Sequence, residues 1–197
     1  MLEIRPATLH DLPGAYRVCL QTADAGGDAS GSYRNPDLLG HVFVGPYIVG
    51  APELARVVAD EDGVAGYLFG AADTHAFAAW AESSWWPPLR RQYPELADAS
   101  PDAEAIGLIH RPPVAPDAVI ADYPSHLHID LLERARGRGL GRSLVDGLAS
   151  DLRARGSSGV HLEVGTANEN AIAFYRHLGF EVLRPLDGSQ LMGLRLD

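Results

Sequence analysis

The sequence contains no lysine, and this absence excludes several classes of function. A Walker-A phosphate loop needs a lysine at the phosphates, and enzymes that use pyridoxal phosphate need one for the Schiff base. All 16 basic residues of the chain are therefore arginines. Cysteine is nearly absent as well. The single Cys19 cannot form a disulfide within the chain, which favours a reducing compartment.

Long apolar runs are also missing. No segment approaches the roughly 20 apolar residues that cross a bilayer, so we expect a cytoplasmic protein with no membrane partner. The chain has 197 residues, a length that suits one domain with a single core. Its net charge of −10 argues against a nucleic-acid partner. The arginines nevertheless cluster between residues 134 and 155, and such a local basic patch indicates a small anionic ligand.

Hydrophobic periodicity predicts a mixed arrangement of strands and helices. Strands are predicted at residues 2–7, 56–59, 64–70, 126–132, 160–164, 180–183 and 190–196. Helices are predicted at residues 11–24, 36–44, 77–86, 140–155 and 169–178. We expect Gly45-Pro46 to stop the second helix and the run Trp85–Pro88 to stop the third. The alternation of strands and helices in the last third favours a mixed α/β sheet.

The most informative segment runs from Leu131 to Ser143, where a strand gives way to a helix. Free N–H groups at a helix start carry partial positive charge and bind a pyrophosphate directly. Glycines let the backbone approach a ligand closely, and arginines add charge-assisted hydrogen bonds. The segment supplies Gly137, Gly139, Gly141, Arg136, Arg138 and Arg142. The even spacing of these glycines does not match the dinucleotide-binding fingerprint, because Arg142 stands where its third glycine belongs.

This turn resembles the acetyl-CoA signature R-x-x-G-x-G of GNAT N-acetyltransferases, through Arg136, Gly139 and Gly141. In that family the turn holds the CoA pyrophosphate, and the strand before it bonds the pantetheine arm through its backbone. The resemblance implies the second role for Leu131 and Leu132. Many family members carry proline at the position of Glu133, and we expect this departure to alter the bend modestly.

A second block resembles the same family. The run from Asn168 to Phe180 contains N-x-x-A-x-x-F-Y-x-x-L-G-F. In the family the asparagine contacts pantetheine and the tyrosine lies near the thioester sulfur, roles that the resemblance carries to Asn168 and Tyr175. Asn168 also stands where it can cap a helix, and an ordinary core position remains the alternative for Tyr175.

The resemblance implies an α/β (α+β) GNAT fold with a mixed central sheet of six to seven strands, flanked by helices and splayed at the acetyl-CoA site. Residues 1–197 would form one domain, with an insertion at about 75–120 over the acceptor side. The implied cofactor is acetyl-CoA. The residues expected to bind it are Leu131, Leu132, Arg136, Gly137, Arg138, Gly139, Leu140, Gly141, Arg142, Ser143, Asn168, Ala171 and Tyr175.

Candidate catalytic groups lie on the strand before the turn. His126, His128 and Asp130 alternate along it and share one face. We take Asp130 and His128 as first choices for the general base, with Glu163 weaker, and Tyr175 as the group that hydrogen-bonds the leaving thiolate. A backbone N–H of Leu131 or Leu132 would bind the oxyanion. A structural His–Asp pair and, with His110, a metal site remain alternatives, although no metal is expected.

The expected reaction is acetyl transfer to an amine of a small molecule or peptide. A tryptophan-rich cluster (Trp80, Trp85, Trp86 and Tyr93) could line the acceptor pocket or be ordinary core. One alternative is a non-catalytic module that binds acetyl-CoA or a protein, since residues 123–130 are loosely similar to the acetyltransferase-like domain beside some O-GlcNAc hydrolases. A protein or histone acetyltransferase is the other. A homodimer is also open.

Overall fold

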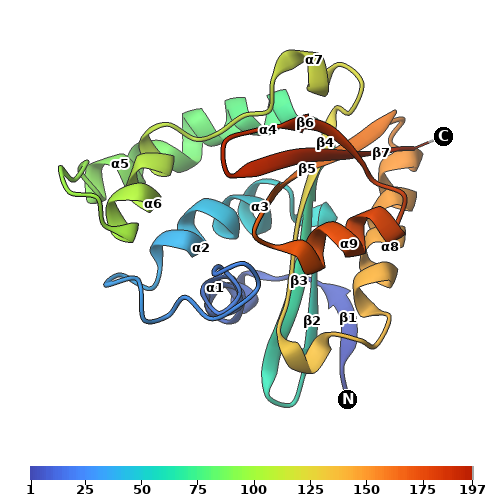
Figure 1. Cartoon of the computed structure of the whole chain (residues 1–197). Coiled ribbons are helices and arrows are strands. Elements are labelled where there is room, and N and C mark those ends of the chain that lie inside the picture. The colour runs from blue at the N-terminus through green and yellow to red at the C-terminus, as the bar shows by residue number, and fades with distance from the viewer. Residues whose placement is uncertain (197) are drawn as a thin grey trace.

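The computed structural model describes residues 1–196 and has a seven-stranded sheet at its centre (Figure 1). The strand order is β1-β2-β3-β4-β5-β7-β6. The strands are β1 (Glu3–Pro6), β2 (Ala55–Asp60), β3 (Gly63–Ala71), β4 (Ser125–Leu131), β5 (Gly159–Gly165), β6 (Glu181–Pro185) and β7 (Ser189–Arg195). Only β4 and β5 pair in parallel, and the other neighbours are antiparallel. The predicted mixed sheet is confirmed.

The sheet splits between its two parallel strands. β4 pairs with β3 along its length, from His126 to Leu131. It pairs with β5 only at Ser125 and His126. Beyond that point the edge of β4 that faces β5 has no neighbouring strand, so its backbone polar groups are left for other partners.

Helices cover both faces of this sheet (Figure 1). One face carries α1 (Leu12–Leu20), α2 (Leu38–Phe43) and α3 (Gly45–Gly50), and the other carries α8 (Leu140–Ala154) and α9 (Glu169–His177). Each face has its own cluster of buried residues. In α8 the leucines at i, i+4 spacing, Leu144, Leu148 and Leu152, are all buried against the sheet.

The range 75–120 is mostly helical. It contains α4 (Thr74–Trp80), a π-helical turn (Ala81–Trp85), α5 (Trp86–Gln92), α6 (Pro101–His110) and α7 (Asp117–Ile120). Trp86, Ile106 and Ile109 of this range join the buried cluster that α1–α3 form with the sheet. Short 3₁₀ segments lie at Leu9–Asp11, Pro52–Leu54 and Glu133–Ala135. No helix within residues 1–196 is long and apolar enough to span a membrane.

Two helix ends were predicted at prolines, and the first is confirmed, because α2 ends at Phe43, just before Gly45-Pro46. A new helix then begins, with Pro46 in the first turn of α3. The second predicted end, at Trp85–Pro88, is wrong, because the helical path continues there. Pro87 lies in the first turn of α5, immediately after the π-helical turn. Proline is tolerated in a first helical turn because the N–H that it lacks has no partner there.

Candidate active site

A cavity of about 450 Å³ lies at the split, between β4, the turn at 135–142 and α9. Many of the residues named from the sequence line it: Leu131, Asp130, Arg136, Gly137, Gly139, Gly141, Arg142, Asn168, Ala171 and Tyr175. Leu132, Arg138, Leu140, Ser143 and His128 are not among its lining residues. We call this space the splay cavity.

The mouth of the splay cavity is rich in unpaired backbone donors. The N–H groups of residues 137–142 donate to no acceptor within residues 1–196, whereas the next N–H, of Ser143, bonds to the Gly139 carbonyl. These donors end in the first turn of α8, whose 15 residues give its N-terminus a partial positive charge. A run of free N–H groups at such a helix start suits a diphosphate.

The glycines of this turn are required for two different reasons. Gly137 and Gly139 adopt φ values of +69° and +76°, a left-handed conformation that other residues enter at a cost. A side chain at either position would meet nothing within 4 Å, so the space above them is open. Gly141 instead lies close to α9, where an added Cβ would be 3.1 Å from the Phe174 ring.

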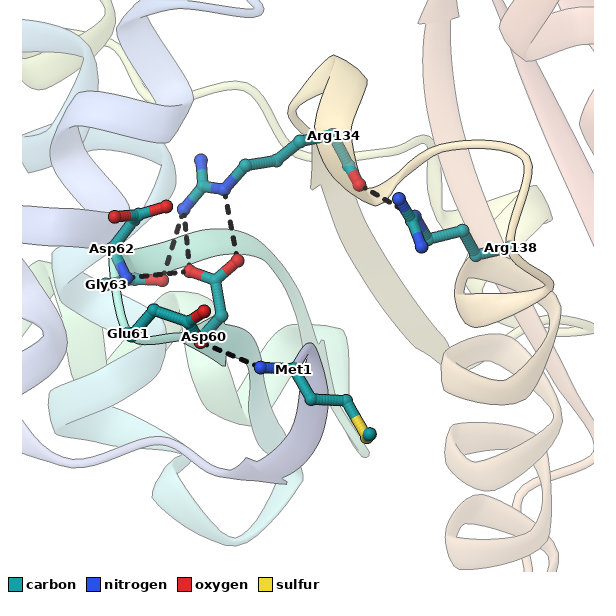
Figure 2. Close-up of polar contacts among 7 residues, drawn as sticks. All are labelled: Met1, Asp60, Glu61, Asp62, Gly63, Arg134 and Arg138. Carbon is teal, nitrogen blue, oxygen red and sulfur yellow. Dashed lines mark hydrogen bonds and ion pairs between the residues drawn. The ribbon is translucent and has the colours of Figure 1, made fainter.

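The arginines near the turn have separate tasks. Figure 2 shows Arg134 reaching across to the β2–β3 hairpin, where it donates to Asp60 (3.3 Å) and to the Gly63 carbonyl (3.2 Å). Arg138 donates to the Arg134 carbonyl (3.0 Å), so it braces the turn from outside the cavity. Both side chains fix the turn, and the phosphate contact expected of Arg138 stays a prediction.

Two other arginines line the splay cavity. Arg136 donates to the Leu131 carbonyl (2.7 Å) and to the Gly26 carbonyl (2.8 Å), so it links β4 to the loop after α1. The Arg142 side chain, by contrast, has no ion pair or hydrogen bond within the described part of the chain. Arg142 is therefore the cation with the freest access to an anion at the helix start.

The backbone of β4 presents donors to the same cavity. The Leu132 N–H donates to the Ala65 carbonyl (2.8 Å), so it is already paired and cannot bind an oxyanion. Alternate residues of a strand direct their N–H groups to opposite sides. The N–H groups of Ile129 and Leu131 consequently point toward the split, where no strand lies to accept them.

Asp130 is held by a neighbour from β3. The Tyr67 hydroxyl donates to Asp130 Oδ2 at 2.5 Å. Burial raises the pKa of Asp130 to about 6, although the hydrogen bond from Tyr67 opposes that rise. A carboxylate with a pKa near 6 is mostly ionised at neutral pH and is still basic enough to accept a proton.

Tyr175 lies in the splay cavity with Asp130. Its side chain is buried, and burial raises the pKa of its phenol, so the hydroxyl keeps its proton at neutral pH. No hydrogen bond holds this hydroxyl within residues 1–196, yet it is not among the sealed, unpaired polar atoms of that range. The hydroxyl is thus open to the cavity. Nearby, Asn168 caps α9, and its Oδ1 accepts from the Ala171 N–H (3.1 Å).

The two histidines of β4 face a second, smaller cavity. It has about 100 Å³ and lies on the side of β4 that carries α3 and α4. The Thr74 hydroxyl donates to the Pro124 carbonyl, so its oxygen accepts from His126 Nδ1 (2.8 Å), and His126 Nε2 accepts from the Tyr47 hydroxyl (2.9 Å). His126 is therefore fully engaged, with a threonine and a tyrosine rather than the aspartate of a structural His–Asp pair.

Other candidates fall outside both cavities. Glu163 is exposed and accepts from the Ser189 hydroxyl (2.6 Å). His110 contacts the Tyr93 carbonyl (2.8 Å), and no cluster of three or more metal-ligating side chains occurs among residues 1–196. Of the tryptophan-rich cluster, Trp86 lines the smaller of these two cavities, and Trp80, Trp85 and Tyr93 pack against the core.

Several residues at these cavities escaped the sequence analysis. Ala25, Gly26, Ile129 and Phe174 line the splay cavity, and Tyr67 orients Asp130. Phe174 lay within the second motif, and Ile129 could have been found from the alternation of backbone groups along a strand. No local signal marks Tyr67 or the loop after α1, because folding alone brings them to the site.

Comparisons with protein-family models and with curated proteins both gave matches. The model of the acetyltransferase (GNAT) family matches residues 46–180. Protein O-GlcNAcase of Rattus norvegicus is 30% identical over 186 residues, which are 92% of this chain and 20% of that protein. The chain therefore spans about a fifth of the length of this curated relative.

Solved structures agree in fold. The crystal structure of SsHAT is 36% identical in sequence, with a TM-score of 0.90, over 100% of this chain and 98% of that chain. The structure of yncA from Salmonella typhimurium with its cofactor acetyl-CoA has a TM-score of 0.59 over 100% of this chain and 94% of that chain. Its sequence is 16% identical, so this second likeness concerns the fold alone.

Proposed function

The chain belongs to the acetyltransferase (GNAT) family, and from this premise we propose that it is an acetyl-CoA-dependent N-acetyltransferase. The acceptor in this proposal is an amine of a small molecule or peptide. Both resemblances seen in the sequence, to the GNAT family and more loosely to the O-GlcNAcase-associated domain, are confirmed by the comparisons.

One observation carries the proposal: the free N–H groups of residues 137–142 stand at the mouth of a cavity beside the unpaired Arg142. This donor set fits a diphosphate in number and charge. The unpaired N–H groups of Ile129 and Leu131 extend it along the cavity, where they suit the amide-bearing arm of CoA. Acetyl-CoA, when bound, supplies the acetyl group as a thioester.

The residues inside the cavity provide proton transfer for the reaction. The amine nitrogen forms a bond to the carbonyl carbon while the carbon–sulfur bond breaks. Asp130 accepts the proton that the bound ammonium loses, and the proton that the nitrogen loses after its attack passes to the departing sulfur, to which Tyr175 donates a hydrogen bond. The N–H of Ile129 or Leu131 stabilises the negative charge on the carbonyl oxygen.

The amine must be neutral to attack, which makes the base useful. An alkyl amine with a pKa of about 10.4 is neutral in roughly one part in 10³ at pH 7. Asp130, ionised at that pH, removes a proton within the cavity where bulk water has limited access. Such a base contributes roughly 10² to 10⁴ in rate.

Two measurements test the proposal. Calorimetric titration with acetyl-CoA should give one site per chain, and a thiol-release assay over an amine panel should give turnover with at least one amine. Absence of binding at millimolar acetyl-CoA would refute the proposal. Binding without release of thiol by any amine would instead favour the non-catalytic module.

A further inference from the structure

The second cavity, which we call the acceptor cavity, lies two residues along β4 from the proposed reaction centre. His128 lines the acceptor cavity, and Asp130 lines the splay cavity. These residues are two apart on β4 and share one face, so their Cα atoms are about 6–7 Å apart. A group held beside His128 is consequently within reach of a thioester held beside Asp130.

The walls of the acceptor cavity are apolar and aromatic. They are formed by Val42, Phe43, Pro46, Tyr47, Thr74, Phe77, Ala78, Ala81, Trp86, Pro112, Pro113, Val114, His126 and His128. None of these residues is acidic or an arginine, although the chain as a whole carries a net charge of −10. The cavity therefore has no carboxylate to bind a second ammonium group and no cation to bind a carboxylate.

Three of the five polar side chains in these walls hydrogen-bond to one another. Tyr47, His126 and Thr74 form a hydrogen-bonded chain that ends on the Pro124 carbonyl. His128 is different, because it makes only ring contacts, with Phe43 and Tyr47 at centroid distances of 5.4 Å. Its nitrogens are not among the sealed, unpaired atoms of residues 1–196, so they remain open to a ligand.

The size of the acceptor cavity limits what can enter. A volume of about 100 Å³ corresponds to roughly three water-sized groups, and a methylene group is of similar size. A dry cavity that holds a benzene ring measures about 150 Å³. The space therefore fits the three or four carbons of a slender alkyl chain better than it fits an aromatic ring.

We infer that the acceptor cavity receives an unbranched alkyl arm of about four carbons that ends in a primary amine, with His128 accepting a hydrogen bond from the amine. A free alkylamine and a lysine side chain both contain such an arm. The inference rests on the proposed acetyl transfer and adds the class of acceptor. The aromatic faces attract the ammonium form as it enters, before the proton is lost.

A series of n-alkylamines tests the inference by chain length. With saturating acetyl-CoA, kcat/KM should rise about fourfold for each methylene from ethylamine to butylamine, because each buried methylene adds apolar contact. It should level off beyond butylamine and be at least about tenfold lower for 2-phenylethylamine. A flat series, or a preference for 2-phenylethylamine, would overturn the inference.

Two neighbouring alanines of α4 offer a matched pair of variants. Ala78 lines the acceptor cavity, whereas Ala79 is exposed and does not. Ala78→Leu should raise KM for butylamine at least about tenfold by filling the space, and should leave the affinity for acetyl-CoA unchanged. Ala79→Leu should change neither. Equal effects of the two variants on KM would contradict the assignment.

A blocked lysine distinguishes the two sources of the alkyl arm, which are a free alkylamine and a lysine side chain. Butylamine is compared with a lysine residue blocked as Nα-acetyl-lysine amide, and a higher kcat/KM for either one assigns the source. Calorimetry with acetyl-CoA precedes these assays, so that a failure of the proposed function can be told apart from a failure of the inference about the acceptor. Absent acetyl-CoA binding refutes the proposed function, whereas acetyl-CoA binding with turnover of 2-phenylethylamine but of neither arm refutes only the inference.

Discussion

The splay cavity and the acceptor cavity lie on the same strand but are built in different ways. The splay cavity takes most of its donors from the backbone of β4 and of the turn at 137–142. The acceptor cavity is made of side chains from segments far apart in the chain, around residues 42–47, 74–86, 112–114 and 126–128. Backbone conformation therefore fixes the shape of the splay cavity, and side-chain packing fixes that of the acceptor cavity.

This difference explains how each cavity would respond to amino-acid substitutions. Backbone donors are lost only when the conformation changes, so the splay cavity depends on a few glycines and on the start of α8. Side-chain walls can be reshaped by single substitutions without disturbing the sheet. The chemistry of acetyl transfer can therefore stay constant while the acceptor varies.

The largest expected effect comes from Asp130, at the boundary of the two cavities. Asp130→Asn removes the proton acceptor and should lower kcat about 10² to 10⁴-fold. The affinity for acetyl-CoA, measured by calorimetry, should stay unchanged because the N–H groups at 137–142 are not altered. A variant with normal kcat would show that another group is the base.

Arg142 should matter for binding rather than for chemistry. Arg142→Ala removes a charge-assisted contact to the diphosphate, which should weaken acetyl-CoA binding by about ten- to a hundredfold. Arg155→Ala is the matched control, because it removes the same charge at the far end of α8, where Arg155 donates to the Asp151 carbonyl outside the cavity. Equal losses of affinity in the two variants would mean that general positive charge, not the position of Arg142, attracts the ligand.

Gly139 tests the role of backbone conformation directly. Gly139→Ala places a side chain at a φ of +76°, with a strain of about 1–2 kcal/mol. If the ligand needs this conformation, its affinity should fall about five- to thirtyfold in titration. Gly147→Ala is the control, since that helical glycine has open space around it and no such φ. Unchanged affinity for Gly139→Ala would argue against a backbone-held diphosphate.

The smallest expected change concerns Tyr67, which reaches the site from β3. Wild-type activity should rise with pH through about 6, because Asp130 acts only when ionised. The hydrogen bond from Tyr67 lowers that pKa, so Tyr67→Phe should move the acid limb of kcat/KM to higher pH and cost about twofold at pH 7.

The Tyr67→Phe variant needs its own control. Tyr33→Phe also removes a partly buried hydroxyl, but at a position away from both cavities. It should leave the pH profile in place. An acid limb that stays at the wild-type pH in Tyr67→Phe would show that Tyr67 does not orient Asp130.

The same contrast between backbone and packing decided what the sequence could predict. The path from β4 through the turn into α8 follows from local alternation, glycines and leucine spacing, so its elements were predicted nearly to the residue. The contact between Tyr67 and Asp130 spans 63 residues, and that between Gly26 and Arg136 spans 110. No local pattern encodes such contacts.

The prolines illustrate the same limit on a smaller scale. Pro87 was predicted to end a helix, because a proline usually does so when only its neighbours are considered. In the structure a π-helical turn precedes it, so it enters the first turn of α5 and Trp86 reaches the acceptor cavity. Packing of the aromatic side chains, which a linear pattern does not reveal, decides this path.

A crystal structure with acetyl-CoA would test the central claim most directly. The account predicts diphosphate oxygens within hydrogen-bonding distance of the N–H groups of residues 137–142, with the thioester between Asp130 and Tyr175. A cofactor bound elsewhere, with those N–H groups still unpaired, would contradict it.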